Sequence, residues 1–403
     1  MGTFVATAVA GGQLEHVRYV TDESGGDAAV NFLLGVLSDP FYVGELAPVV
    51  QHPLDLSRHL AALWGFLTGF GVGIWRVGPV PVPYPTVPSI RLGLFGFTAY
   101  QAALSTVASV LLGLPGAYLL ARYEFRGRGL VRSLTIIPFV LPSIMVVVGF
   151  FAMFGRNGLF NDVLGALGLG PVQLLFTLKI IVLAHAFYNA PLVTRLVGAA
   201  WESVDLRRVE TARALGASPW AAFRHVVYPQ LRPALLTAAL LTFIFTFMSF
   251  PIVLELGGLR LATVEVWVFR RVQSYDLPVA ATLAALETVV SLGLTYVYLR
   301  YEARQSASRE GGPTLPRRAL LVGRETLADP RRLGLLAYAA VVVVVFVGPL
   351  FSMVVESLTG PGGGFTTAYY QFLVTQQSSA AVGTTKPLPA IVNSLLFGAG
   401  TLL

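Results

Sequence analysis

The stretch Val209-Glu-Thr-Ala-Arg-Ala-Leu-Gly216 lies between two long apolar runs and continues into Ser218-Pro219 and Tyr228-Pro229. Its residues are good helix formers up to Gly216, which stands where a helix would end in a left-handed residue. Ser218 is a cap residue and Pro219 suits a first helical position, so a second helix is predicted from Trp220 to Tyr228, ending at Pro229. The pattern predicts a rigid pair of short helices joined at Gly216.

The order of residues in this stretch resembles the EAA loop of ATP-binding-cassette (ABC) importer permeases, with Thr211 in place of the usual second-position alanine. In that family the loop docks into a cleft of the cytoplasmic ATPase. The resemblance implies that Glu210 meets a basic residue of the ATPase and that Ala212 is small because the cleft is tight. The docking residues that it implies are Glu210, Thr211, Ala212, Gly216, Phe223 and Pro229. The alternative is an ordinary solvated loop between two spans.

The composition is that of a membrane protein, since 55% of residues are hydrophobic, 12% are charged and the mean hydropathy is +0.70. A soluble domain averages about 25% charged residues. Apolar runs near the ~20 residues needed to cross a bilayer as helices recur along the chain. The predicted fold class is an all-α polytopic transmembrane bundle, which the resemblance narrows to the type I ABC importer permease fold. The predicted spans are 97–121, 133–154, 175–194, 233–256, 279–299 and 333–355, with another helix opening at 391.

Arginine is concentrated in alternate loops. Residues 122–132 hold four Arg and one acid, 195–232 six Arg and three acids, and 300–332 eight Arg and four acids. Because cytoplasmic loops carry excess positive charge, these three loops are predicted to be cytoplasmic, and 155–174, 257–278 and 356–390 external. The expected location is the plasma or inner membrane, as a multi-pass protein.

The first part of the chain differs from the rest in its charge balance. Residues 1–10 are either the outer part of a first spanning helix or an ordinary polar start. Residues 11–93 carry seven acids and four Arg, which favours an external segment. The apolar run 59–75 is at the short limit of a span, and we predict an interfacial or re-entrant helix there. The proline-rich piece 79–85 is predicted to be an extended connector.

The domain prediction follows from these segments. Residues 1–94 form an N-terminal segment, 95–300 a first permease domain with the EAA-like loop at 203–230, and 301–332 an Arg-rich linker. Residues 333–403 are predicted to begin a second, truncated repeat, because Val392-Asn-Ser-Leu resembles the opening at Tyr100-Gln-Ala-Ala. Fused two-repeat permeases of the resembled family are common for ferric iron and thiamine.

Polar and proline residues inside the predicted spans are candidates for a translocation path. They are His185, Tyr188, Asn189, Glu287, Pro138 and Pro142. Polar groups in hydrocarbon usually face the bundle interior and mark pathways, but they can also be interhelical hydrogen bonds. Pro138 and Pro142 together are the better candidate for a functional bend.

No catalytic, phosphate-loop or metal-ligand motif is recognisable, and the chain has no Cys. We therefore expect no catalytic residue, no bound metal and no cofactor, with ATP bound by a partner subunit. The resemblance implies two ATPase copies and an extracytoplasmic solute-binding protein as partners. The Arg residues lie at the ends of apolar runs, so the bilayer is an expected partner and nucleic acid is not.

The sequence bears on three classes of function. An ATP-driven importer permease is favoured, with ferric iron or thiamine as substrate and a sugar, sulfate or polyamine left open. An ion-gradient-driven secondary transporter needs midplane carboxylates, for which Glu287 is the candidate. A membrane-embedded enzyme lacks a catalytic set.

Overall fold

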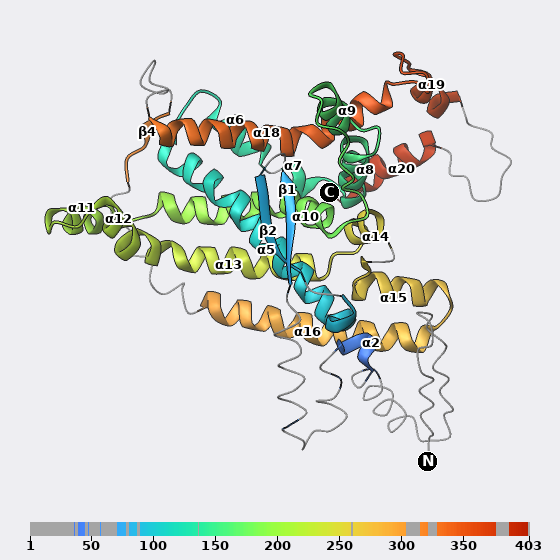
Figure 1. Cartoon of the computed structure of the whole chain (residues 1–403), viewed down its shortest axis with the longest axis horizontal. Helices are drawn as coiled ribbons and strands as arrows, with labels where there is room; N and C mark the ends of the chain where they lie inside the picture. Colours follow the sequence, from blue (N-terminus) through green and yellow to red (C-terminus); the bar gives the residue numbers. More distant parts are fainter. Residues whose placement is uncertain are drawn as a thin grey trace. The chain divides into compact units, whose positions relative to one another are not determined.

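The computed structural model describes residues 36, 39–44, 47, 57, 71–77, 80–86, 89–135, 137–258, 261–303, 315–320, 329–375 and 387–401. These residues belong to two compact units, one made of Met1–Val147 and Leu174–Ala340, the other of Val148–Gln173 and Val341–Leu403. Helices dominate both units, as predicted for an all-α fold (Figure 1).

The elements of the first unit, some of which continue into the second, are α2 (Pro40–Val43), β1 (Gly71–Val77), β2 (Val80–Thr86), α5 (Ser89–Arg122), β3 (Tyr123–Glu124), α6 (Arg128–Leu134), α7 (Ile137–Val140), α8 (Ser143–Phe154), α10 (Leu178–Glu202), α11 (Leu206–Ala214), α12 (Pro219–Ala222), the π-helical turn η2 (Phe223–Val227), α13 (Tyr228–Phe247), α14 (Pro251–Gly257), α15 (Val264–Gln273), α16 (Leu277–Ala303), β4 (Arg318–Ala319) and α18 (Pro330–Ser357). The second unit adds α9 (Leu159–Ala166), α19 (Ala368–Thr375) and α20 (Pro387–Gly400).

Within the described residues, 6 helical stretches are long and apolar enough to cross a membrane. They are Leu92–Arg122, Ser143–Ala166, Leu178–Glu202, Pro219–Phe247, Leu277–Ala303 and Arg332–Ser357. Each overlaps one predicted span, and the helix predicted to open at 391 is α20.

Two predicted spans are interrupted by proline. The span predicted over 133–154 is wrong in its first part, because α6, α7 and α8 are separate helices there. Pro138 lies in the first turn of α7 and Pro142 immediately precedes α8, so each lacks an amide where a continuous helix would need one. The span predicted over 233–256 likewise breaks between α13 and α14, just before Pro251.

A β-hairpin corrects the prediction for the first part of the chain. Strand β1 pairs antiparallel with β2, from Gly71 opposite Thr86 to Val77 opposite Val80. The helix predicted over 59–75 is therefore wrong at 71–75, and 58–70 lie outside the described residues. Residues 80–85 are extended, as predicted for the proline-rich piece. Its prolines alternate along β2, so their missing donors lie on one edge of the strand and the other edge keeps its hydrogen bonds.

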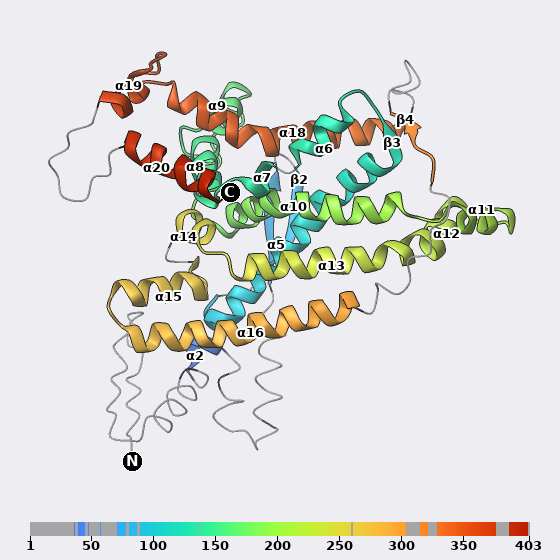
Figure 2. The same ribbon diagram turned by 180° about the vertical axis from the view of Figure 1, so that it is seen from behind.

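The core of the first unit is built around α10, where Ile180, Ile181 and Phe187 are fully buried. Helix α5 approaches α10 closely at Gly113, whose carbonyl oxygen accepts a 3.0 Å hydrogen bond from the Thr194 hydroxyl. Helices α10, α13 and α16 run side by side (Figures 1 and 2). Small residues at such contacts let helices pack tightly in a bilayer, where lipid supplies no hydrophobic drive for association.

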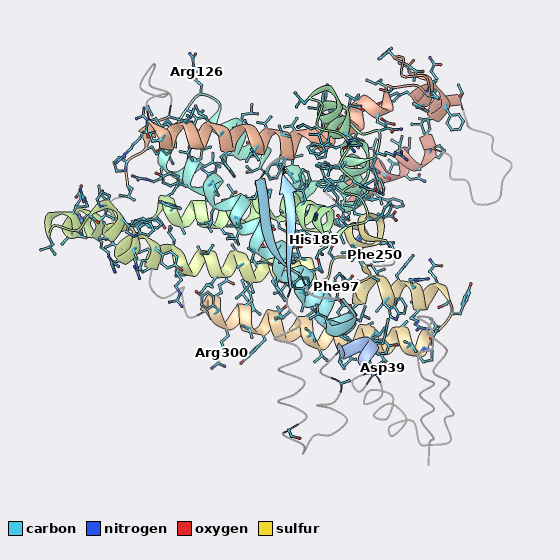
Figure 3. The ribbon with its side chains drawn as sticks, viewed as in Figure 1. Asp39, Phe97, Arg126, His185, Phe250 and Arg300 are labelled. Atoms are coloured by element: carbon cyan, nitrogen blue, oxygen red, sulfur yellow. The ribbon has the colours of Figure 1, made fainter. Side chains whose placement is uncertain are left out.

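The three Arg-rich loops meet at one end of the first unit. Glu202 at the end of α10 pairs with Arg128 at 2.8 Å and with Arg317 at 3.2 Å, so one carboxylate joins all three loops. Figure 3 labels Arg126 and Arg300 toward this end, and Asp39 toward the other. The convergence is what the predicted cytoplasmic side requires.

Cysteine labelling tests this sidedness, and the chain has no native Cys. Ser203 and Ser274 are both exposed, at opposite ends of the first unit. On intact cells, a membrane-impermeant maleimide is expected to label Ser274→Cys and to label Ser203→Cys only after the membrane is opened. Labelling of Ser203→Cys from outside would overturn the predicted topology.

Candidate functional site

The 203–230 loop begins with a capped helix, α11. The side chain of Asp205 accepts a 3.0 Å hydrogen bond from the amide of Arg207, which satisfies one of the free donors at the helix start. Leu206, Val209 and Ala212 are half-buried on one face of α11, as their spacing predicts. Glu210 lies beside this face and is exposed, so a partner can reach its carboxylate.

The helix ends at Gly216 in a Schellman turn. The amide of Ala217 donates to the carbonyl of Ala212, and the amide of Gly216 donates to that of Arg213, both at 3.0 Å. Gly216 has a φ angle of +88°, a backbone conformation that would be strained in a residue with a side chain. The prediction that the helix ends at Gly216 in a left-handed conformation is therefore confirmed, and both hydrogen bonds of the turn are formed.

The second half of the loop differs from the prediction. Ser218 caps α12 by accepting from the amide of Ala221 at 3.1 Å, as expected. The helix predicted to end at Pro229 instead continues through η2 into α13, where the Tyr228 amide donates to the carbonyl of Phe223. A π turn is wider than an α turn and leaves room for the proline ring, so Pro229 does not terminate the helix.

A column of contacting aromatic rings connects the 203–230 loop to the residues that follow α5. Trp220 stacks on Phe223 at 5.5 Å between ring centroids, and Phe223 stacks on Trp201 at 6.2 Å. Trp201 contacts Tyr118, which contacts Tyr123 at the end of α5. Burial, together with a hydrogen bond to Tyr118, raises the pKa of Tyr123 above its ordinary value. Phe223 is thus half-buried in this ring stack rather than exposed on the surface of the loop.

Two large apolar residues are exposed on the loop, and the sequence interpretation did not single them out. Leu215 is 83% exposed and Trp220 is 68% exposed. The available signal was that Leu215 and Trp220 flank the predicted turn at Gly216, where solvent exposure is expected, and exposed apolar patches mark contact sites. Together with Glu210 they give the loop an apolar surface with an acidic residue nearby on the same loop.

The path candidates His185 and Asn189 lie inside the first unit. His185 is 1% exposed, and its ring nitrogens lie 3.0 Å from the Ser105 hydroxyl and 2.9 Å from the Ser249 hydroxyl. The Asn189 amide donates to the His185 carbonyl at 3.0 Å. The two His185 contacts join α10 to α5 and to the segment between α13 and α14, whereas the Asn189 bond lies within α10. Figure 3 shows His185 within the bundle.

The remaining path candidates lie elsewhere. The Tyr188 hydroxyl donates to the Phe139 carbonyl at 3.4 Å, which places Tyr188 beside α7 and thus beside Pro138. Phe139 also contacts Phe245 of α13. Glu287 of α16 is 4% exposed, and its Oε1 atom has no hydrogen-bond partner among the described residues. No group of three or more metal-ligating residues occurs in the described part of the chain.

Residues 109–305 match the family described as binding-protein-dependent transport system inner membrane components. The chain is also 33% identical over 231 residues to the molybdenum transport system permease protein ModB of Azotobacter vinelandii, covering 56% of this chain and 97% of that protein. This chain belongs to that family. The predicted resemblance to ABC importer permeases and the membrane location are thereby confirmed.

Other members of the family are longer. The chain is 35% identical over 225 residues to the thiamine transport system permease protein ThiP of Brucella abortus (strain 2308), which covers 55% of this chain and 41% of that protein. The ThiP of Escherichia coli (strain K12) is 34% identical, with 64% and 46% covered. The chain therefore spans less than half the length of these thiamine permeases.

Among solved structures, a bacterial ABC transporter involved in the import of the acidic polysaccharide alginate matches with a TM-score of 0.45 and 17% identity, covering 53% of this chain and 79% of that chain. The MetNI methionine ABC transporter matches with a TM-score of 0.39 and 20% identity, covering 52% and 94%.

Proposed function

We propose that this chain is a membrane-spanning permease of an ATP-driven importer and that its 203–230 loop docks the ATPase subunit. The observation that carries the proposal is the exposed set of Glu210, Leu215 and Trp220 on a loop that is capped, ended by a Schellman turn and backed by stacked rings. We refer to these three exposed residues as the tip of the loop. Because the loop is rigid, a partner bound at the tip can transmit its movement to the helices of the permease.

ATP hydrolysis belongs, in this proposal, to two copies of a separate ATPase, with a solute-binding protein on the outer side. Membership of a binding-protein-dependent family supports this assignment over an ion-gradient-driven transporter. It also supports a transport role, rather than an enzymatic one, for the chain itself.

Thiamine is the substrate that we propose. It rests on the identity to the thiamine permeases, whereas other relatives are named for molybdenum and, in Marchantia polymorpha, for sulfate. Ferric iron, the other substrate expected from the sequence, has no support among these relatives. We also propose that residues 333–403 are the start of a second permease repeat.

We also propose different roles for the path candidates. His185 acts as an interhelical hydrogen-bonding group, because it is buried and its ring meets Ser105 of α5 and Ser249. Asn189 supports it from within α10 by donating to the His185 carbonyl. Tyr188 is the better candidate for the path wall, since it lies with Phe139 at the proline-interrupted segment 135–142.

Charge reversal tests the docking proposal. Glu210→Lys is expected to weaken ATPase binding by roughly 30-fold, because close interfacial charge pairs contribute about 2 kcal/mol or more. Trp220→Ala should weaken it as well, by removing an exposed aromatic anchor. The measurement is copurification of the ATPase with the tagged permease from detergent-solubilised membranes.

The matched control is Glu302→Lys, the same charge reversal at an exposed residue near the end of α16, on the same predicted side of the membrane. It should leave copurification unchanged. Wild-type copurification with both Glu210→Lys and Trp220→Ala would mean that the 203–230 loop is a plain solvated loop.

A further inference from the structure

The linker segment 315–320 is anchored against the first unit at both of its ends. Leu315 packs against the cluster of Val204, Val227 and Leu231, at the base of the 203–230 loop. Leu320 is 4% exposed and packs with Leu119, Tyr123 and Leu335. A linker that only spaced two domains would not need to bury apolar side chains at both ends.

Backbone pairing holds the middle of this segment in place. Strand β4 pairs in parallel with β3, so that Arg318 lies opposite Tyr123 and Ala319 lies opposite Glu124. The amide of Leu320 extends the pairing by donating to the carbonyl of Glu124 at 3.0 Å. Residues 318–320 are therefore fixed to the residues that follow α5.

Arg317 adds an electrostatic contact to the base of the loop. Its guanidinium lies 3.2 Å from a carboxylate oxygen of Glu202 and 3.8 Å from one of Glu124. Glu202 is the last residue of α10 and immediately precedes the 203–230 loop. Its carboxylate also receives Arg128 at 2.8 Å, so Arg317 closes a network rather than forming an isolated surface pair.

The segment and the aromatic column pack against the same cluster. Trp201 and Phe223 belong to the side chains that pack around the cluster contacted by Leu315. At its other end, Leu320 shares a cluster with Leu335 and Leu336 of α18. Residues 315–320 thus link the base of the 203–230 loop to the first turns of α18.

We propose that residues 315–320 form a strap that sets the position of the 203–230 loop and passes its movement to α18, with Glu202 as the positioning residue. The inference rests on the proposed docking function, but the strap contacts are internal to the chain. Loss of the strap should leave Glu210, Leu215 and Trp220 exposed on the loop, because the strap contacts are made with Glu202, Glu124 and the cluster of Val204, Val227 and Leu231. The ATPase would then bind and hydrolyse ATP with less transport for each ATP consumed.

The first measurement requires no ATPase. A nitroxide attached at Thr211→Cys, on the exposed face of α11, reports the mobility of the loop in the full chain in detergent micelles. Removing the strap contacts with Leu315→Ala plus Arg317→Ala is expected to narrow the spectral lines, because the loop becomes more mobile. Arg317→Lys should restore part of the wild-type spectrum by keeping the charge. Arg126→Ala, at an exposed arginine of the same end, should leave it unchanged.

The second measurement is the number of substrate molecules imported per ATP in the complete transporter reconstituted in liposomes. We expect Leu315→Ala plus Arg317→Ala to lower this ratio by about fivefold, the low end of typical coupling between sites. ATPase copurification should stay at the wild-type level. Glu202→Gln should lower the ratio in the same direction, since it removes the charge that Arg317 contacts.

The outcomes separate the two proposals. An unchanged spectrum and an unchanged ratio in the strap variants, with copurification lost in Glu210→Lys, would overturn the strap and leave docking intact. A mobile loop in the strap variants, with copurification retained in Glu210→Lys and Trp220→Ala, would support positioning by the strap and overturn docking.

Discussion

Gly113→Leu is expected to prevent stable packing of α5 against α10. A Cβ atom at this position would lie 2.7 Å from the carbonyl oxygen of Ala190 and 2.7 Å from the Cβ of Val193. Neither neighbour is the free end of a flexible side chain, so the two helices would have to separate. Separation would also break the hydrogen bond from Thr194 to the Gly113 carbonyl. We expect a loss of about 3 kcal/mol, the upper part of the range for overpacked cores.

The measurement for Gly113→Leu is the yield of monodisperse protein after detergent extraction, together with its thermal unfolding midpoint. Gly293→Leu is the matched control, because it makes the same change within the α16 span, where a Cβ atom would meet nothing within 4 Å. The control should fold and unfold like the unchanged protein. Equal behaviour of the two variants would mean that α5 and α10 do not meet at Gly113.

The spans and the first half of the 203–230 loop could be predicted because their signals are local. A run of about 20 apolar residues is enough to indicate a spanning helix. The ends of α11 follow from Asp205 and Gly216, whose side-chain chemistry acts within a few residues. Such features depend little on what packs against them.

The effect of proline on the helices was predicted only in part. At Pro138 and Pro142 a bend within one span was predicted, whereas the helix is interrupted there and α8 starts after Pro142. At Pro229 the helix continues, because the π-helical turn bonds Tyr228 to Phe223 and accommodates the ring. Whether a helix stops or widens at proline depends on the packing around it, and the ring stack of Trp201, Phe223 and Trp220 was not visible in the sequence.

The contacts that join distant segments could not be predicted from one sequence. Arg317 and Glu202 are separated by 115 positions, and His185 is separated from Ser105 by 80. No local pattern distinguishes a serine that bonds a histidine across two helices from one that faces lipid. For the same reason the Arg-rich linker indicated only sidedness, although its residues 315–320 make specific contacts with segments distant in the sequence.

Arg128 joins the ends of two central helices. Its side chain is 12% exposed, and its Nε and Nη2 atoms donate to the carbonyl of Leu120 at 2.9 and 2.6 Å. Leu120 lies in the last turn of α5, where carbonyl groups lack partners within the helix. Nη2 also donates to Glu202 at 2.8 Å. A carboxylate at the end of α10 is unfavourable toward the helix dipole, so this pairing offsets a local cost.

Arg128→Ala is therefore expected to cost about 2–3 kcal/mol of unfolding free energy, less than the 3–5 kcal/mol typical of breaking a fully buried pair. The discount reflects Glu202, which is 27% exposed and keeps Arg317 as a partner at 3.2 Å. Arg128→Lys should lose less unfolding free energy than Arg128→Ala, because lysine keeps the charge. It should still be less stable than the unchanged protein, since lysine lacks the planar fork that reaches both Leu120 and Glu202. The measurement is thermal unfolding in detergent, monitored by circular dichroism.

The control for Arg128 is Arg132→Ala, because Arg132 approaches the same carboxylate at 3.9 Å but is 57% exposed. An exposed pair of this kind contributes about 0–1 kcal/mol, so this variant should unfold close to the unchanged protein. A double variant with Glu202→Gln isolates the pair: after Glu202→Gln, Arg128→Ala should cost less than it does alone. If Arg128→Ala unfolded like Arg132→Ala, the joint between α5 and α10 would have to depend on their apolar contacts rather than on this arginine.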